Sequence, residues 1–207
     1  MSKARLETFS DGVFAIAATL LILNVRAPGG DLSHGLRHIW PSYAGYAVSF
    51  LTIGIMWVNH HSVFAQIEAV DRTFLCINVV FLMVVAFVPF PTELVTSHIR
   101  DNGARAACLA YGFTLTAMAV LYSTVWFYAA GRRRLLREDA DPRVVRGITR
   151  SYLPGPFIYL TATLVSFASP VASVVLFAAI ALFYVAESSV FGGRAPATSP
   201  ADPEPWE

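Results

Sequence analysis

Long apolar blocks alternate with short polar stretches along most of the chain. A helix needs about 20 apolar residues to cross the hydrocarbon core of a bilayer. Six blocks approach that length: Leu6–Arg26, Ser42–Ala65, Thr73–Val95, Arg105–Ala130, Tyr152–Ala168 and Val171–Phe191. The pattern predicts an all-α integral membrane protein with six transmembrane helices per chain.

The final stretch, GGRAPATSPADPEPWE (residues 192–207), has no apolar pattern and is rich in Pro, Gly and Ala. Such a composition is typical of disordered segments. We find no internal repeat and no sign of a second domain. The expected organisation is one six-helix domain over residues 1–191, followed by a disordered tail.

The composition supports a membrane protein over a soluble one. Hydrophobic residues make up 56% of the chain and charged residues 14%, with a mean hydropathy of +0.56. A soluble domain carries about 25% charged residues. The net charge of +1 gives no overall attraction to nucleic acid.

The basic residues between the segments predict the orientation. Residues 131–150 contain seven arginines: Arg132, Arg133, Arg134, Arg137, Arg143, Arg146 and Arg150. With a cytoplasmic N-terminus, 11 Lys and Arg residues face the cytoplasm and 4 face outside. Because basic residues collect in cytoplasmic loops, we expect a multi-pass protein of the cell membrane with both termini cytoplasmic. The rival interpretation is a nucleic-acid or anionic-lipid patch, but it leaves the asymmetry between the two sides unexplained.

The first segment has two different surfaces. At about 100° per residue, Ile16, Leu20 and Leu23 share one sector with Thr19, which makes an apolar ladder with a single hydroxyl. Arg5 and Phe9 fall in the same sector, and Ser10 and Asp11 lie outside it. Spacing alone fits both ordinary helix packing and a pore lining.

Polar residues of the first three segments are expected at similar depth. The second segment carries Trp57, His60, His61 and Phe64 at helical spacing, and Asn78 lies early in the third. A charge within a membrane faces a partner or water. We therefore expect Asp11 to pair with a histidine and to be hydrogen-bonded through Ser10 or Asn78. The cluster fits three roles: a structural clamp, a proton relay or pH sensor, or a metal site, which the diverging histidines fit worst.

No motif of enzymatic chemistry is present. The chain lacks G-x-S-x-G, a P-loop and H-E-x-x-H, which mark hydrolases, nucleotide-binding enzymes and zinc proteases. We therefore expect no enzyme, no cofactor and no metal ligand set.

Three stretches resemble one known family. R-x-x-x-F-S-D-G-V-F-A-I-A-x-T-L-L from Arg5 to Leu21 resembles the first-helix signature of the transmembrane protein 175 family of potassium channels. W-V-N-H-H-S-V-F (Trp57–Phe64) and the stretch Asn78–Leu94, with its P-F-P, resemble that family's second-helix and third-helix patterns. The resemblance is sharp over roughly the first 95 residues and extends beyond them only to the six-segment plan.

This resemblance implies a passive potassium-permeable channel, in which four copies of the chain place their first helices around a four-fold axis. It assigns the pore constriction to Ile16, Leu20 and Leu23, with Thr19 as the polar pore neighbour. It also implies a structural polar network, which the depth argument extends to Asn78. Its members are Arg5, Phe9, Ser10, Asp11, Trp57, His60, His61 and Asn78. The implied partners are the chain itself, membrane lipid and potassium ions, with no nucleic acid.

The chain lacks the T-V-G-Y-G filter of other potassium channels, so stacked apolar rings are the expected gate. Arg5 fits two places, the cytoplasmic mouth of the pore or the polar network. The alternative function is a proton-coupled secondary transporter that uses Asp11 and His60 or His61 as its relay. A third reading is a membrane scaffold without transport, in which the ladder serves packing only.

Overall fold

The computed structural model describes residues 2–132 and 135–191. Their regular structure is helical, apart from one isolated bridge between Ile67 and Leu136, so the all-α prediction is confirmed. The elements are α1 (Lys3–Leu20), the 3-10 helix η1 (Leu21–Asn24), α2 (Leu32–His38), α3 (Trp40–Ala65), α4 (Arg72–Phe87), α5 (Pro89–His98), α6 (Ala104–Gly131), α7 (Pro142–Tyr152), α8 (Gly155–Val165) and α9 (Pro170–Phe191). The tail predicted over residues 192–207 lies outside the described residues.

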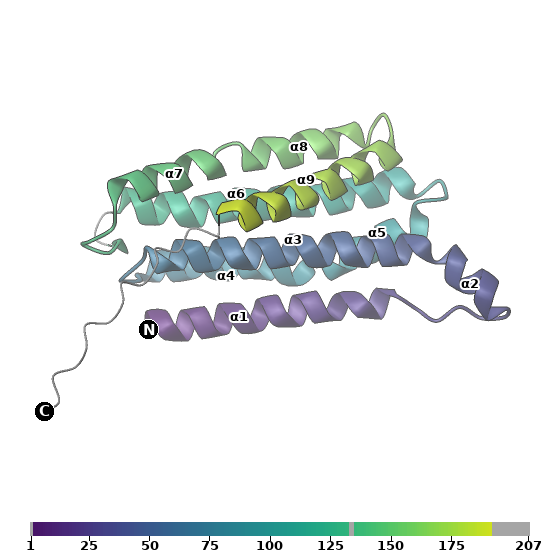
Figure 1. The fold of residues 1–207 in the computed structure, drawn as a ribbon, viewed down its shortest axis with the longest axis horizontal. Coiled ribbons are helices and arrows are strands. Elements are labelled where there is room, and N and C mark those ends of the chain that lie inside the picture. Colours follow the sequence, from purple (N-terminus) through teal and green to yellow (C-terminus); the bar gives the residue numbers. More distant parts are fainter. Residues whose placement is uncertain (1, 133–134, 192–207) are drawn as a thin grey trace, which may run out of the picture.

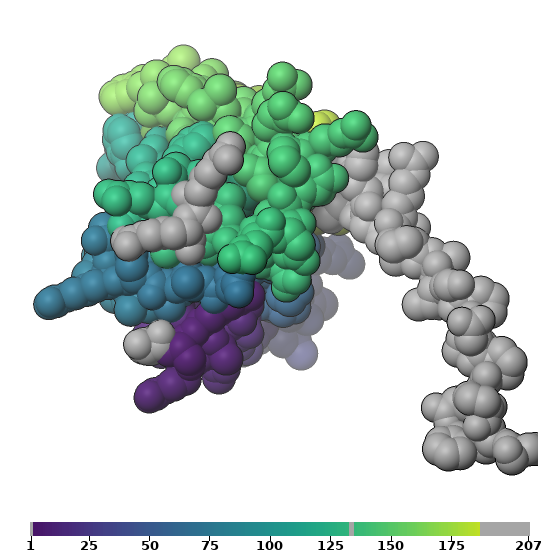
Figure 2. Space-filling model, turned by 90° about the vertical axis from the view of Figure 1, so that its left-hand side faces the viewer, coloured from purple at the N-terminus to yellow at the C-terminus, as the bar shows by residue number. Residues whose placement is uncertain are grey.

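The helices form an elongated bundle with α1 along one side and α7 and α8 along the other (Figure 1). Helix α6 packs against α4, α5 and α8, and α1 packs on α3 and α4. The N-terminus and the α3–α4 and α6–α7 connections share one end, which we call the N-terminal end (Figure 1). Seen from that end, α1 and α8 lie on opposite sides of the bundle (Figure 2).

Length and composition make three described segments able to cross a membrane: Lys3–Asn24, Arg72–His98 and Ala104–Gly131. Leu32–His38 and Trp40–Ala65 give a fourth as a pair bent by 46°. The third predicted segment is broken near Val88, because Pro89 and Pro91 fit the first turn of a new helix, α5.

The last two predicted segments are helical but shorter than a full span. Helix α8 has 11 residues, or about 16 Å at 1.5 Å per residue, against a hydrocarbon core of about 30 Å. Leu153 and Pro154 keep right-handed helical dihedrals, so α7 extends α8 toward the N-terminal end. Helix α8 alone is therefore shorter than the hydrocarbon core is thick. Helix α9 is apolar through Ala186.

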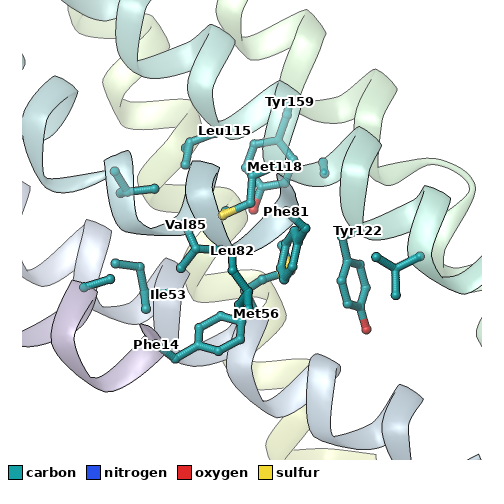
Figure 3. Close-up of a cluster of buried hydrophobic side chains, with 14 of the residues drawn as sticks. Phe14, Ile53, Met56, Phe81, Leu82, Val85, Leu115, Met118, Tyr122 and Tyr159 are labelled. Carbon is teal, nitrogen blue, oxygen red and sulfur yellow. The ribbon is translucent and has the colours of Figure 1, made fainter. Parts of the chain in front are cut away.

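Large apolar side chains fill the space between α1, α3, α4 and α6 (Figure 3). Phe14, Ile53, Phe81, Leu115 and Met118 are all buried. The rings of Phe14 and Phe81 lie 6.0 Å apart between centroids, which ties α1 to α4. This core fixes which face of α1 points inward.

Gly112 allows α6 and α8 to approach closely. A Cβ there would lie 2.5 Å from Thr163 Oγ1 and 2.9 Å from Thr163 Cβ. We expect Gly112→Ala to destabilise the protein by about 1–2 kcal/mol, since overpacking outweighs the better helix propensity of alanine. The measurement is thermal unfolding in detergent, with Gly147→Ala as the control, because a Cβ at Gly147 meets nothing within 4 Å. Equal melting temperatures for the two variants would contradict the close approach.

Candidate pore-lining helix and its polar network

Helix α1 buries one face and exposes the other. Its buried positions, at spacings of four, four and three residues, are Leu6, Ser10, Phe14 and Ala17. This spacing gives a single stripe on a helix with 3.6 residues per turn. Val13 and Ala18 flank this stripe and are partly buried against the core, whereas the side of α1 opposite the stripe is exposed.

The apolar ladder lies on that exposed surface. Ile16 is 61% exposed, Leu20 41% and Leu23 66%. Thr19 is also exposed, and its hydroxyl donates a hydrogen bond to the carbonyl oxygen of Ile16 at 2.9 Å. The hydroxyl oxygen of Thr19 therefore keeps acceptor capacity for water or a cation. Whether these residues line a pore stays a prediction.

The change from α-helix to 3-10 helix aligns Leu23 with Leu20. Residues Leu21–Asn24 form η1, in which about three residues complete one turn. A continuous α-helix would turn Leu23 about 60° away from Leu20. The 3-10 turn instead places the two side chains one above the other, so the ladder is straighter than a uniform helical wheel indicates.

A chain of hydrogen bonds joins α1, α3 and α4 inside the bundle. Asn78 Nδ2 donates to Ser10 Oγ at 3.1 Å, and His60 Nε2 lies 3.1 Å from Asn78 Oδ1. Ser10 Oγ in turn donates to the carbonyl oxygen of Leu6 at 2.8 Å. Ser10, Asn78 and His60 are all buried. Buried polar groups need such partners, so this chain fixes three helices relative to one another.

Aromatic rings surround the imidazole of His60. Its ring centroid lies 4.2 Å from that of Phe64, 5.4 Å from that of Phe14 and 6.0 Å from that of Phe81. His60 therefore combines one polar contact, to Asn78, with tight packing against three helices. This environment suits a structural side chain.

Asp11 has a different partner from the one expected. Its carboxylate oxygen accepts a hydrogen bond of 2.8 Å from Trp57 Nε1, and both side chains are exposed. The prediction that Asp11 pairs with a histidine is therefore wrong. Successive helical residues point about 100° apart, so Ser10 enters the bundle while Asp11 stays at its rim.

Other members of the predicted network lie apart from it in the single chain. Arg5, Phe9 and His61 are exposed. Within the described part of the chain, no hydrogen bond or ion pair joins them to Ser10, Asp11, Asn78 or their partners. Their place in a network stays a prediction. Nor do the described residues contain a group of three or more His, Cys, Asp or Glu side chains suited to a metal ion.

An apolar groove of about 650 Å³ adjoins Asp11 and Trp57. Residues of α1, α3 and α9 line it, among them Ala15, Ala18, Phe50, Gly54, Val58 and Val185. The groove thus lies beside the exposed face of α1, and its lining is apolar apart from Asp11 and the indole nitrogen of Trp57.

A second buried polar cluster was missed by the sequence analysis. Ser49 Oγ lies 2.8 Å from Thr92 Oγ1 and 3.0 Å from Tyr111 Oη, which links α3, α5 and α6. Asn24 Nδ2 also donates to the carbonyl oxygen of Pro89 at 3.0 Å. The sequence contains only a weak indication of this cluster. Thr92 directly follows the P-F-P stretch, and because proline has no backbone N–H, carbonyl groups in the preceding turn lose their usual helical donor.

Comparison with known proteins identifies one family. Residues 5–89 match the family model described as endosomal/lysosomal potassium channel TMEM175. A potassium channel of Chamaesiphon minutus is 39% identical over 191 residues, covering 89% of this chain and 94% of the relative. A potassium channel of Streptomyces collinus is 40% identical over 187 residues, covering 88% and 91%.

The fold also matches a solved structure. The crystal structure of a lysosomal potassium-selective channel TMEM175 homolog from Chamaesiphon minutus superposes with a TM-score of 0.82. The sequence identity is 37%, over 90% of this chain and 97% of that one. With apolar helices long enough to cross a bilayer, the chain is a multi-pass membrane protein, and it belongs to the TMEM175 family.

Proposed function

We propose that four copies of this chain form a potassium-permeable channel of the cell membrane, with α1 of each copy lining the pore. The observation that carries the proposal is the exposure of Ile16 and Leu20 on α1 and of Leu23 on η1, in one line. The potassium channels named among the relatives support the choice of ion. Residues 1–191 would then be the channel domain, with potassium as the permeant ion and no cofactor.

A second copy of the chain is the natural partner for the exposed side of α1. One helix cannot enclose a pore, so rotational symmetry must supply the remaining walls. Four copies would turn each ladder residue into a ring, and three apolar rings would stack along the axis. The groove beside Asp11 and Trp57 offers an apolar surface for a neighbouring subunit. Four is the copy number that the family resemblance implies.

The apolar rings would control ion flow by controlling whether water can fill the pore. A narrow apolar ring excludes water and blocks ions, and a slightly wider ring conducts. The Thr19 hydroxyls, between the rings of Ile16 and Leu20, would replace part of the hydration shell of a passing ion. In the described structure the hydrogen-bond partner of Asp11 is Trp57 and not a histidine. The carboxylate would therefore hold α1 against α3 rather than act in a proton relay.

The basic residues support an N-terminal end in the cytoplasm. The helix termini, connections and short helix α7 at that end contain eight described basic residues: Lys3, Arg5, Arg72, Arg132, Arg137, Arg143, Arg146 and Arg150. The elements at the other end contain four: Arg26, Arg37, Arg100 and Arg105. Both termini would then be cytoplasmic under the positive-inside rule.

The test is potassium flux from liposomes that contain the purified full-length protein. We expect flux driven by voltage alone, which persists when no proton gradient is present, and a native mass of four chains. A flux that requires a proton gradient and disappears in Asp11→Asn would favour the secondary transporter. An assembled protein that passes no potassium would overturn the channel proposal.

A further inference from the structure

Helix α7 carries three arginines on one exposed line. Arg143, Arg146 and Arg150 are spaced by three and four residues, which places them on one side of a helix. All three are exposed, and the described acidic residues include none within α7. The helix begins where the Asp141 carboxylate accepts a hydrogen bond of 2.7 Å from the backbone nitrogen of Arg143.

The opposite face of α7 is fixed to the bundle. Val145, Ile148 and Tyr152 pack against the hydrophobic core. Trp126 Nε1 donates to Thr149 Oγ1 at 2.9 Å, which attaches the middle of α7 to α6. Because one face is held, the arginine line is held in an outward direction.

The same line continues along α8 as apolar side chains. From Arg150 the spacing of three and four residues leads on to Leu153, Phe157, Leu160, Leu164 and Phe167, and all of them are exposed. Leu153 and Pro154, which join the two helices, have dihedrals in the right-handed helical region. The exposed stripe of α7 and α8 thus changes from cationic to apolar within about one turn. Such a change matches the boundary between lipid headgroups and hydrocarbon.

The three arginines form no side-chain ion pair within the described residues. Arg137, in the preceding loop, pairs with Asp139 through two contacts of 2.8 Å. No described acidic side chain forms an ion pair with Arg143, Arg146 or Arg150. Their guanidinium groups are available to an external anion, and the planar donor geometry of arginine suits phosphate.

We propose that Arg143, Arg146 and Arg150 bind the phosphate groups of anionic phospholipids, whose acyl chains lie along Leu153 and Phe157. Helices α7 and α8, which carry the stripe, lie on the side of the bundle away from α1 (Figures 1 and 2). If α1 lines the pore, as in the proposed function, the stripe faces the surrounding lipid. A nucleic acid would use the arginines but would leave the apolar half of the stripe uncovered, so a lipid is the better fit.

The test measures lipid retained by the purified full-length protein in native mass spectrometry. Phosphatidylglycerol is added in one arm and phosphatidylcholine in the other. We expect preferential retention of phosphatidylglycerol, which weakens about fivefold per arginine removed (~1 kcal/mol each near an anionic surface). The variant Arg143→Gln/Arg146→Gln/Arg150→Gln is compared with Arg26→Gln/Arg37→Gln/Arg105→Gln, which removes as many arginines from the opposite end.

Three outcomes would overturn the proposal: equal phosphatidylglycerol retention by the two triple variants, equal retention of both lipids by the wild type, or displacement of bound lipid by a single-stranded oligonucleotide. If the α7 triple variant does not assemble, Arg150→Gln and Arg150→Lys are compared, and the lysine variant should keep most of the retention. Potassium flux is measured separately in vesicles of phosphatidylcholine alone. If the protein conducts potassium in these vesicles but shows no preference for phosphatidylglycerol in native mass spectrometry, this proposal is wrong and the proposed function stands.

Discussion

Replacing Ile16 with asparagine is expected to raise potassium flux about tenfold or more, which corresponds to a barrier lower by ~1.4 kcal/mol. Ile16 is 61% exposed on the ladder face of α1. In a symmetric assembly, four amide groups would replace four apolar side chains at one level of the pore. An amide hydrogen-bonds water, so the ring would no longer exclude it. The measurement is voltage-driven flux from liposomes.

The matched control is Leu182→Asn on α9, because Leu182 is 60% exposed but lies on a different helix. It should leave the flux unchanged. Leu23→Ala should also raise the flux, since Leu23 of η1 stands in line with Leu20 at the end of α1. If Ile16→Asn and Leu182→Asn assemble normally and conduct alike, Ile16 does not limit the ion path.

The exposed and buried faces of α1 could be predicted from the sequence, because the helix is a regular α-helix over most of its length. The wheel separated Ile16 and Leu20 from Ser10, and the structure places them on exposed and buried faces. It could not show the 3-10 turn at Leu21, because that turn depends on contacts with α3 and α5. Local sequence is a weak guide to such tertiary effects.

The depth of the polar residues along the bundle could be predicted from the sequence, but the partner of each polar side chain could not. His60 and Asn78 meet as their matched depth predicts. The partner of Asp11 was misjudged because two adjacent residues point about 100° apart, and only the packed bundle shows that Trp57 lies beside Asp11. The hydroxyl groups of Ser49 and Thr92 escaped notice, since single hydroxyls in apolar helices usually satisfy themselves on their own backbone.

Replacing Asn78 with leucine is expected to destabilise the protein by about 2–4 kcal/mol. The side chain is buried, and its Oδ1 is the hydrogen-bond partner of His60 Nε2. Leucine would leave that nitrogen unpaired in an aromatic cage and would fit the site imperfectly. The measurement is thermal unfolding in detergent. Trp57→Phe is the control, because it removes an exposed bond to Asp11 and should cost at most about 1 kcal/mol.

The double variant His60→Phe/Asn78→Leu decides whether the buried chain is only structural. Each single variant leaves one buried polar atom without its partner, whereas the double variant removes both atoms. We therefore expect it to be more stable than Asn78→Leu by about 1–3 kcal/mol, with potassium flux close to the wild type. Ser10 keeps its hydrogen bond to Leu6 throughout. A stable double variant that no longer conducts would instead place His60 in the conduction mechanism.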